Sequence, residues 1–331
     1  MVSLGGTDLS VFEWFPGKHS GSNIYLKGHL DNPSRLGKTF HEWPGREGIQ
    51  PYVAASEIRL GGRDIYLTGY ILADTDLECK NHLSALYSLI DGFTGLVPLI
   101  TDFGVFQVYV KDTISPEYIT DQGLKITIVF REPMPDLSGI MPESDEAQYG
   151  ISDISFSALG GFLIEIAGEV RNRPSTKQPQ FTSYSKEGYQ VTKTQARELN
   201  IKLFIEQPDY SAFQDKIKGL YALLNAPGLR RLKAVNDISI SFFIKDGFEV
   251  HTLHDQGSSF AGLVEFKLVQ TGVLMDVPGL VIKGSLVSIN GSIVQIKVGT
   301  APPVELADLK VNGSTVIIQN NRIQIKTIKE I

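Results

Sequence analysis

Cysteine is almost absent from this 331-residue chain, and long apolar runs are missing as well. The single Cys79 excludes an internal disulfide and a cysteine-based zinc site, which indicates a reducing compartment or a protein indifferent to redox state. The most apolar stretch, residues 83–100, is interrupted by Asp91 and by glycines. The first residues also lack the basic and then apolar pattern of a signal peptide. We therefore expect neither a signal peptide nor a transmembrane helix.

Positive charge is in short supply too. The chain has 31 Lys and Arg residues against 37 Asp and Glu residues, a formal net charge of -6, and no long basic run. A protein that binds the phosphate backbone of nucleic acids needs clustered cations, so we expect no sequence-specific or general nucleic-acid partner. The length predicts two or three domains, each with enough chain to bury a core.

The common catalytic motifs are missing. The chain contains no G-x-S-x-G, no phosphate-binding G-x-x-x-x-G-K-[ST] and no dinucleotide-binding G-x-G-x-x-G. Ser183-x-x-Lys186 resembles a serine-lysine pair, but it lies in a polar stretch without a supporting second motif. His251 and His254, next to Asp255, are three residues apart and would point to opposite faces of a strand. We expect no enzyme activity, no metal site and no cofactor.

What the sequence does contain is an internal repeat. Matching residues recur at a constant offset of 134 (197 minus 63), and an upstream set recurs at 140 (168 minus 28). A fixed order of motifs at a fixed spacing is the mark of a duplicated domain. The pairs at 134 are Arg63 and Arg197, Ile71 and Ile205, Leu86-Tyr87 and Leu220-Tyr221, Lys111-Asp112 and Lys245-Asp246, and Asp121-Gln122-Gly123 and Asp255-Gln256-Gly257. Those at 140 match 28–34 with 168–175, after one inserted residue, Arg173, and 46–48 with 186–188.

Each half predicts the same elements. Residues 65–71 and 107–110 have the composition of half-buried strands, and 199–205 and 238–244 match them. One helix is expected between these strands in each half, with a buried face at the same spacing. Capping boxes at Thr75-x-x-Glu78 and Ser211-x-x-Gln214 would begin the helices. The two expected core faces consist of Cys79, Leu83, Leu86, Tyr87 and Ile90, and of Phe213, Ile217, Leu220, Tyr221 and Leu224.

Several strands with a single helix indicate an α+β fold, mainly β, because a parallel sheet would need a helix after nearly every strand. We expect two tandem antiparallel β-sandwich or barrel units, each with one flanking helix, and a small all-β domain. Asn290-Gly291 and Asn312-Gly313 predict hairpin turns in that last domain. The expected boundaries are 1–132 for the first unit, 133–153 for a linker, 154–274 for the second unit and 275–331 for the β-hairpin domain.

Two polar arms, residues 31–48 and 171–188, stand out within these units. Long segments without regular structure are usually functional or disordered, and both copies share a mixture of cations and aromatics. One interpretation is a mobile surface loop. The other is an arm that contacts a neighbouring subunit, where Trp, Tyr and Arg are favoured anchors. The expected contact residues are Arg35, Lys38, Trp43 and Arg46 in the first arm, and Arg173, Lys177, Phe181, Tyr184 and Lys186 in the second.

Two motifs carry a resemblance to a known family. The loop 43–48, with sequence W-P-G-R-E-G, precedes residues 56–70, which contain the strand R-D-I-Y-L at 63–67. This pattern resembles the loop and strand of the distal tail proteins of long-tailed bacteriophages. The resemblance covers residues 20–132, recurs more weakly in 155–272 and does not reach the C-terminal region. It implies the tail-tube fold, a β-sandwich flanked by a helix that assembles into six-membered rings around a channel.

The duplication makes the chain more similar to tail hub proteins, in which two tube-like domains per chain let a trimer present six units. The resemblance implies a structural protein of a phage or prophage tail tip or baseplate, assembled in the bacterial cytoplasm and located in the virion tail. Its implied partners are itself, as a trimer or hexamer, and the tail tube, tape-measure and adhesion proteins. The C-terminal β domain could bind host-surface carbohydrate or trimerise the chain.

A second class of function stays open. A non-catalytic carbohydrate-binding or adhesin module would also be rich in β-strands. It should carry a secretion signal and exposed aromatic platforms, and the signal is not found at the start of this chain. An enzyme would be indicated instead if turnover of glycans or esters were lost on changing Ser183 or His254.

Overall fold

The computed structural model describes most of the first 271 residues and short strands beyond them. The chain divides into two compact units, Met1–Leu274 and Met275–Ile331. The described residues are 2–43, 46–145, 149–167, 174–177, 193–234, 238–271, 281–283, 286–289, 292–295, 309–311, 314–319 and 322–327.

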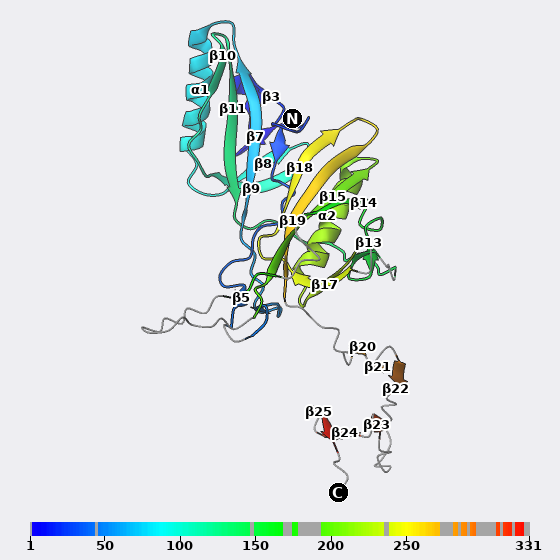
Figure 1. The fold of residues 1–331 in the computed structure, drawn as a ribbon. Helices are drawn as coiled ribbons and strands as arrows, with labels where there is room; N and C mark the ends of the chain where they lie inside the picture. Colours follow the sequence, from blue (N-terminus) through cyan, green and yellow to red (C-terminus); the bar gives the residue numbers. More distant parts are fainter. Residues whose placement is uncertain are drawn as a thin grey trace, which may run out of the picture. The chain divides into compact units, whose positions relative to one another are not determined.

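The first repeat is an antiparallel sheet with strand order β2-β1-β8-β9-β11-β7-β3 (Figure 1). Strand β4 also pairs with β7, and β10 forms an antiparallel hairpin with β11. The elements are β1 (Ser3–Leu4), β2 (Thr7–Asp8), a 3-10 turn (Leu9–Phe12), β3 (Trp14–Pro16), β4 (Leu26–Lys27), β5 (Phe40–His41), β6 (Gln50–Pro51), β7 (Arg63–Leu72), α1 (Asp76–Asp91), β8 (Val97–Thr101), β9 (Gly104–Val110), β10 (Glu117–Thr120) and β11 (Gly123–Glu132).

The second repeat has the strand order β13-β12-β16-β17-β19-β15-β14, with β18 paired to β19. Strand by strand this is the order of the first repeat. Strand β12 falls inside the expected linker 133–153, so this sheet begins before residue 154. Its elements are β12 (Gly150–Ile151), β13 (Ile154–Ser155), β14 (Gly161–Ala167), β15 (Arg197–Gln207), α2 (Tyr210–Asn225), β16 (Arg230–Ala234), β17 (Ile238–Phe243), β18 (Phe248–Asp255) and β19 (Phe260–Gln270).

Strand registers confirm the duplication. Leu26 faces Leu67 between β4 and β7, and Ile166 faces Ile201 between β14 and β15. These two pairs reproduce the offsets of 140 (166 minus 26) and 134 (201 minus 67). An ion pair is repeated as well. Lys111 bonds Asp64 at 2.7 Å in the first repeat, and Lys245 bonds Glu198 at 2.5 Å in the second.

The repeats differ in two connections. Between β3 and β4 the first repeat has a loop at 17–25, whereas β14 runs through the same region with only an irregularity between Leu163 and Glu165. The hairpin of β18 and β19 is also longer: Gly123 faces Leu72, but Ala261 faces Glu206, an offset of 138 (261 minus 123). The expected offset of 134 therefore holds along the edge strand as far as Thr120 and His254, just before the Asp-Gln-Gly motifs, and it becomes 138 in the next strand because four extra residues lie in this hairpin.

Each repeat carries one helix on its sheet. Helix α1 packs on β7 and β11, and α2 packs on β15 and β19. Thr75 caps α1 by accepting a hydrogen bond from the Glu78 amide, as expected. The expected cap at Ser211 is wrong, because Asp209 caps α2 through the amide of Ala212. Asp209 lies 134 residues after Thr75, and its carboxylate also favours the positive end of the helix dipole.

The helix faces lie against the two cores. Tyr87 and Ile90 at the end of the α1 face are half-buried, whereas the remaining members of both expected faces are buried. The same position of the two faces holds a small side chain in α1, Cys79, and a large one in α2, Phe213, and both are buried in a packed core. The buried members are Cys79, Leu83 and Leu86 in α1, and Phe213, Ile217, Leu220, Tyr221 and Leu224 in α2.

The C-terminal unit contains strands in all of its described residues. Two three-stranded antiparallel sheets form, in the orders β20-β21-β22 and β23-β24-β25. The turn residues expected at 290–291 and 312–313 lie outside the described residues. The strands are β20 (Val281–Lys283), β21 (Leu286–Ile289), β22 (Ser292–Gln295), β23 (Leu309–Val311), β24 (Ser314–Gln319) and β25 (Arg322–Thr327).

Candidate assembly interface

The two repeats of Met1–Leu274 meet along the outer edge of β18. Asn32 and Phe248 exchange backbone hydrogen bonds of 2.9 and 3.1 Å, in the pattern of a β-bridge. Farther along, the Asn23 amide donates to the Leu253 carbonyl at 3.0 Å. An edge strand presents unpaired backbone groups, which make it adhesive. Here the first repeat satisfies these groups with the loop segments on either side of β4.

The contact extends beyond both ends of this bridge. The Arg35 amide donates to the Lys245 carbonyl at 2.8 Å, and the Ser34 hydroxyl donates to the Asp246 carbonyl at 3.0 Å. At the other end the Asn23 side chain accepts from the Asp255 amide at 2.8 Å. Residues 22–35 of the first repeat thus follow residues 245–255 of the second over most of their length.

Apolar side chains seal the same contact. Ile24 and Leu30 belong to the first repeat, but they are buried in the core cluster of the second. Phe103 packs edge-on against Tyr210, with ring centroids 5.0 Å apart, and its carbonyl accepts from the Tyr210 hydroxyl at 2.9 Å. The repeats therefore share a core, which couples their folding by the burial of apolar surface.

A buried ion pair lies at the centre of the interface. Arg63 of β7 donates to the Glu132 carboxylate at 2.6 Å, and its other end donates to the Tyr221 hydroxyl at 3.2 Å. Tyr221 of α2 in turn donates to the Leu30 carbonyl at 2.7 Å and stacks on Phe248. Burial raises the pKa of the Tyr221 phenol, so it stays a neutral donor. A buried ion pair needs such additional hydrogen bonds to offset the loss of hydration.

Two titratable side chains border this ion pair. Burial, reinforced by the charge of Arg63, lowers the pKa of His29 to about 3, so its imidazole is neutral at pH 7. Burial also raises the pKa of Asp31 to about 7, although the hydrogen bond from the Val250 amide partly opposes this rise by stabilising the carboxylate. Asp31 as a residue is half-buried, and it lines a hollow together with Lys27 and Glu249.

The structure places the first arm against its own chain. The Arg35 guanidinium lies 5.6 Å from the centroid of the Phe243 ring and donates to a carbonyl at 3.1 Å. Lys38 is exposed and donates to His41 at 2.9 Å. Trp43 is 44% exposed, and the Arg46 guanidinium lies 5.7 Å from its ring. Arg35 thus reaches the second repeat, whereas Lys38 and Arg46 contact side chains of the first.

Only one expected residue of the second arm is described. Lys177 is buried, and its ammonium group donates to the carbonyls of Trp43 at 2.9 Å and Gly48 at 2.5 Å, with Glu42 3.4 Å away. The two arms therefore touch within one chain. The role of the arms at a neighbouring subunit stays a prediction. Arg173, Phe181, Tyr184 and Lys186 lie outside the described residues.

Sequence reasoning missed the centre of the interface. It assigned Tyr221 to the core of its own repeat, but the hydroxyl of this residue bonds the other repeat. It did not single out Glu132 or Phe103. The signal available in the sequence was the arginine that occurs at the same position in both repeats, Arg63 and Arg197, since a repeated cation on a strand is unusual for a core position.

Among the described residues, no group of three or more His, Cys, Asp or Glu side chains could hold a metal ion. His251 lies 3.4 Å from Glu249 and 4.0 Å from Glu265. Ser183 and Lys186 lie outside the described residues. Over that same part of the chain, no helix has the length and apolar character needed to cross a membrane.

Comparison with known proteins gives a distant likeness. No family model matches the chain, and no curated protein matches it. Among solved structures it is similar to the Dit (gp 19.1) protein of phage SPP1, described as a paradigm of the hub adsorption apparatus in phages that infect Gram-positive bacteria. The likeness has a TM-score of 0.33 and 14% sequence identity, and it covers 40% of this chain. The chain spans about half the length of that protein, 49%.

Removing one hydroxyl tests the coupling of the repeats. Tyr221→Phe leaves the Leu30 carbonyl and one Arg63 donor buried without their partner, and we expect it to lower the free energy of unfolding by about 1–3 kcal/mol. The matched control is Tyr87→Phe, at the equivalent position of α1, whose hydroxyl makes only a long 3.5 Å contact and which should change stability by less than about 0.5 kcal/mol. Urea denaturation of both variants measures the difference; equal effects would contradict the coupling.

Asp31 predicts a dependence of stability on pH. Its folded-state pKa is raised from 3.8 to about 7, so between these values the folded state holds a proton that the unfolded state releases. Stability contributed by this group is therefore complete at low pH and is lost as pH rises toward 7. As the pH rises from 5 to 7.5, we expect the free energy of unfolding of Asp31→Asn to increase relative to that of wild type by on the order of 1–2 kcal/mol. Urea denaturation at a series of pH values measures this difference, and an Asp31→Asn curve that runs parallel to wild type over this range would exclude the titration.

Proposed function

We propose that the chain is a non-enzymatic structural protein of a phage or prophage tail tip, which forms a ring or hub between the tail tube and the host-adhesion apparatus. The observation that carries this proposal is the contact between an edge strand of one repeat and loop segments of the other, within one chain. Such a contact is heterologous, since the edge of β18 on one repeat meets the loops around β4 on the other. Repeated between chains, a heterologous contact generates a ring when its rotation closes.

The motif resemblance to distal tail and hub proteins supports the same assignment. With two repeats per chain, three chains would supply six similar units. Partners of such a ring are further copies of this chain, the tail tube, the tape-measure protein and adhesion proteins, and its location is the virion tail. The C-terminal strands, from Val281 onward, would bind carbohydrate on the host surface or join the chains.

The mass of the native assembly tests this proposal. Light scattering across a range of protein concentrations should show a species of about three times the 36.4 kDa of one chain. A glycan array run on the same sample distinguishes the alternative, a carbohydrate-binding or adhesin module. A protein that stays monomeric at every concentration and binds glycans would contradict the ring and favour that module.

A further inference from the structure

The two equivalent edges of the repeats differ in what covers them. On the second repeat, Leu253 of β18 is buried, and its carbonyl accepts a hydrogen bond from the Asn23 amide of the first repeat. All four residues of β10, which match 251–254 at the offset of 134, are exposed. Tyr118 is 53% exposed and Ile119 is 56% exposed. Within the described ranges, β10 pairs with β11 alone, so its other side is an open edge.

Strand register shows that these edges are equivalent. Glu117 faces Lys125 in the first repeat, and His251 faces Leu263 in the second. These partners follow the offsets of 134 for the edge strand (251 minus 117) and 138 for its neighbour (263 minus 125). Residues 111–117 therefore correspond to 245–251, the stretch that the first repeat covers within its own chain.

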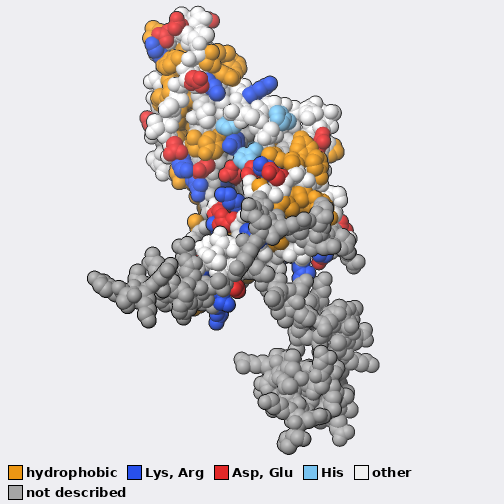
Figure 2. Space-filling view, in the orientation of Figure 1, with side chains coloured by type: hydrophobic (Ala, Val, Ile, Leu, Met, Phe, Trp, Pro, Cys, Tyr) orange, Lys and Arg blue, Asp and Glu red, His pale blue; other side chains and the backbone are white. Residues whose placement is uncertain are grey.

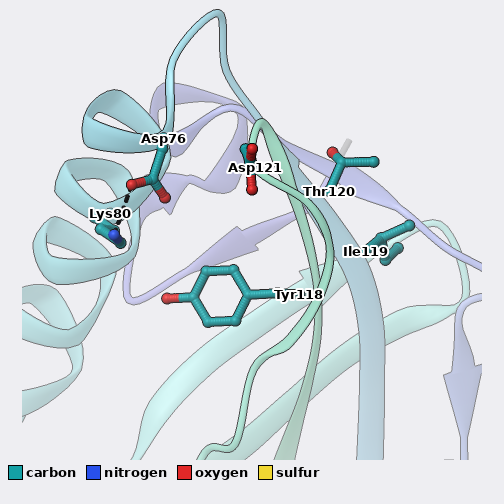
Figure 3. Close-up of a pocket in the computed structure, with 6 residues that line it drawn as sticks. All are labelled: Asp76, Lys80, Tyr118, Ile119, Thr120 and Asp121. Atoms are coloured by element: carbon teal, nitrogen blue, oxygen red, sulfur yellow. Dashed lines mark hydrogen bonds and ion pairs between the residues drawn. The ribbon is translucent and has the colours of Figure 1, made fainter.

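The open edge borders a hollow of about 740 Å³ (Figure 3). It is lined by Asp76 and Lys80 of α1 and by Tyr118 to Asp121 at the end of β10. Tyr118 points toward the helix, while Ile119 points away from it (Figure 3). Asp76 and Lys80 bond each other at 2.6 Å, so the floor carries no unpaired charge from these two groups. Apolar side chains also reach the surface at this end of the first repeat (Figure 2).

The surface that would match this edge is present on the second repeat. The segment at 174–177 corresponds to 33–36, because the bridge of Thr176 with Thr194 repeats that of Arg35 with Leu60. Nearby, β14 forms one end of its sheet and exposes Phe162 by 58% and Ile164 by 52%. A long, apolar and exposed edge strand is a site for association with another chain.

The chain's own copy of this covering segment is already in use. Residues 22–35 lie on β18, so they are not available to the β10 edge of the same molecule. The sequence at the open edge is also adapted to a different partner. Pro116 stands where Val250 donates its amide to Asp31, and the second repeat has Arg171 in place of that aspartate. The amide donor and the carboxylate acceptor of this hydrogen bond are thus both missing at the open edge and its proposed partner.

We propose that the outer edge of β10, with residues 111–116 before it, binds the second repeat of another copy of this chain. The surface supplied by that copy is β14 together with residues 174–177. The contact repeats between chains what the first repeat does to the second within a chain, and it rests on the proposed ring. Each chain then has one satisfied edge at β18 and one edge at β10 that only a second copy satisfies.

Cysteine pairs give a direct test with an internal positive control. Within one chain, the Ser34 hydroxyl bonds the Asp246 carbonyl at 3.0 Å, so Ser34→Cys with Asp246→Cys should form an intrachain disulfide on mild oxidation. The equivalent positions between chains are Ser175 and Asp112. Chains carrying Ser175→Cys are mixed with chains carrying Asp112→Cys, dissociated and reassembled, and then oxidised. Cys79 is buried and remains in all variants.

We expect a linked dimer of twice 36.4 kDa in the mixed sample, and none when the exposed Ile140→Cys replaces Asp112→Cys. An assembly of the expected mass without this link, while the intrachain control links, would overturn the assigned surface and leave the proposed ring standing. A monomer at every concentration would contradict both.

A charge on the open edge gives a second test that needs no disulfide. Ile119→Lys would bury an unpaired ammonium in the contact, and we expect at least a tenfold weaker self-association. Ile140→Lys, at a residue that is 91% exposed, is the matched control and should leave assembly unchanged. Unaltered assembly of the Ile119→Lys variant, measured by sedimentation velocity, would overturn the proposal.

Discussion

The hydrogen-bonded ion pair of Arg63 and Glu132 is the constraint on which the arrangement of the two repeats depends. Its charges are buried, and an ion pair removed from water is stable only when its remaining donors and acceptors are satisfied. The hydroxyl of Tyr221, on the helix of the other repeat, supplies one of these partners. If the repeats separated, the Arg63 guanidinium would lose its hydrogen bond to Tyr221. This hydrogen bond and the shared apolar core together hold the two sheets in one relative position.

The contact between the repeats uses a different surface on each side. The first repeat contributes loops and the second contributes an edge strand, so the contact is not of the two-fold symmetric kind. Proteins with an open edge strand normally protect it with charges, prolines or a covering segment. Here one of two equivalent edges is covered within the chain and the other is exposed. A heterologous contact of this kind is suited to a closed ring, in which every copy covers the next.

Much of the fold could be predicted from the sequence because the chain is a repeat. The offsets of 134 and 140 survive as strand registers, and the helix positions follow from the same spacing. The four-residue extension of the second hairpin could not be predicted, because Asp255-Gln256-Gly257 matched Asp121-Gln122-Gly123 without a gap. The cap of α2 was placed at Ser211, which fits a capping box, whereas the helix begins two residues earlier behind Asp209, a residue type that caps helices about as well as serine. The burial of Lys177 was missed, since both hydrogen bonds of its ammonium group go to backbone carbonyls, which leave no sequence signal.

Electron cryo-microscopy of the concentrated protein tests the central claim most directly. We expect closed particles with three-fold symmetry and six similar lobes, in which the contact at the β10 edge resembles the contact at the β18 edge. Two-fold dimers, or single chains whose β10 edge stays bare at every concentration, would contradict it.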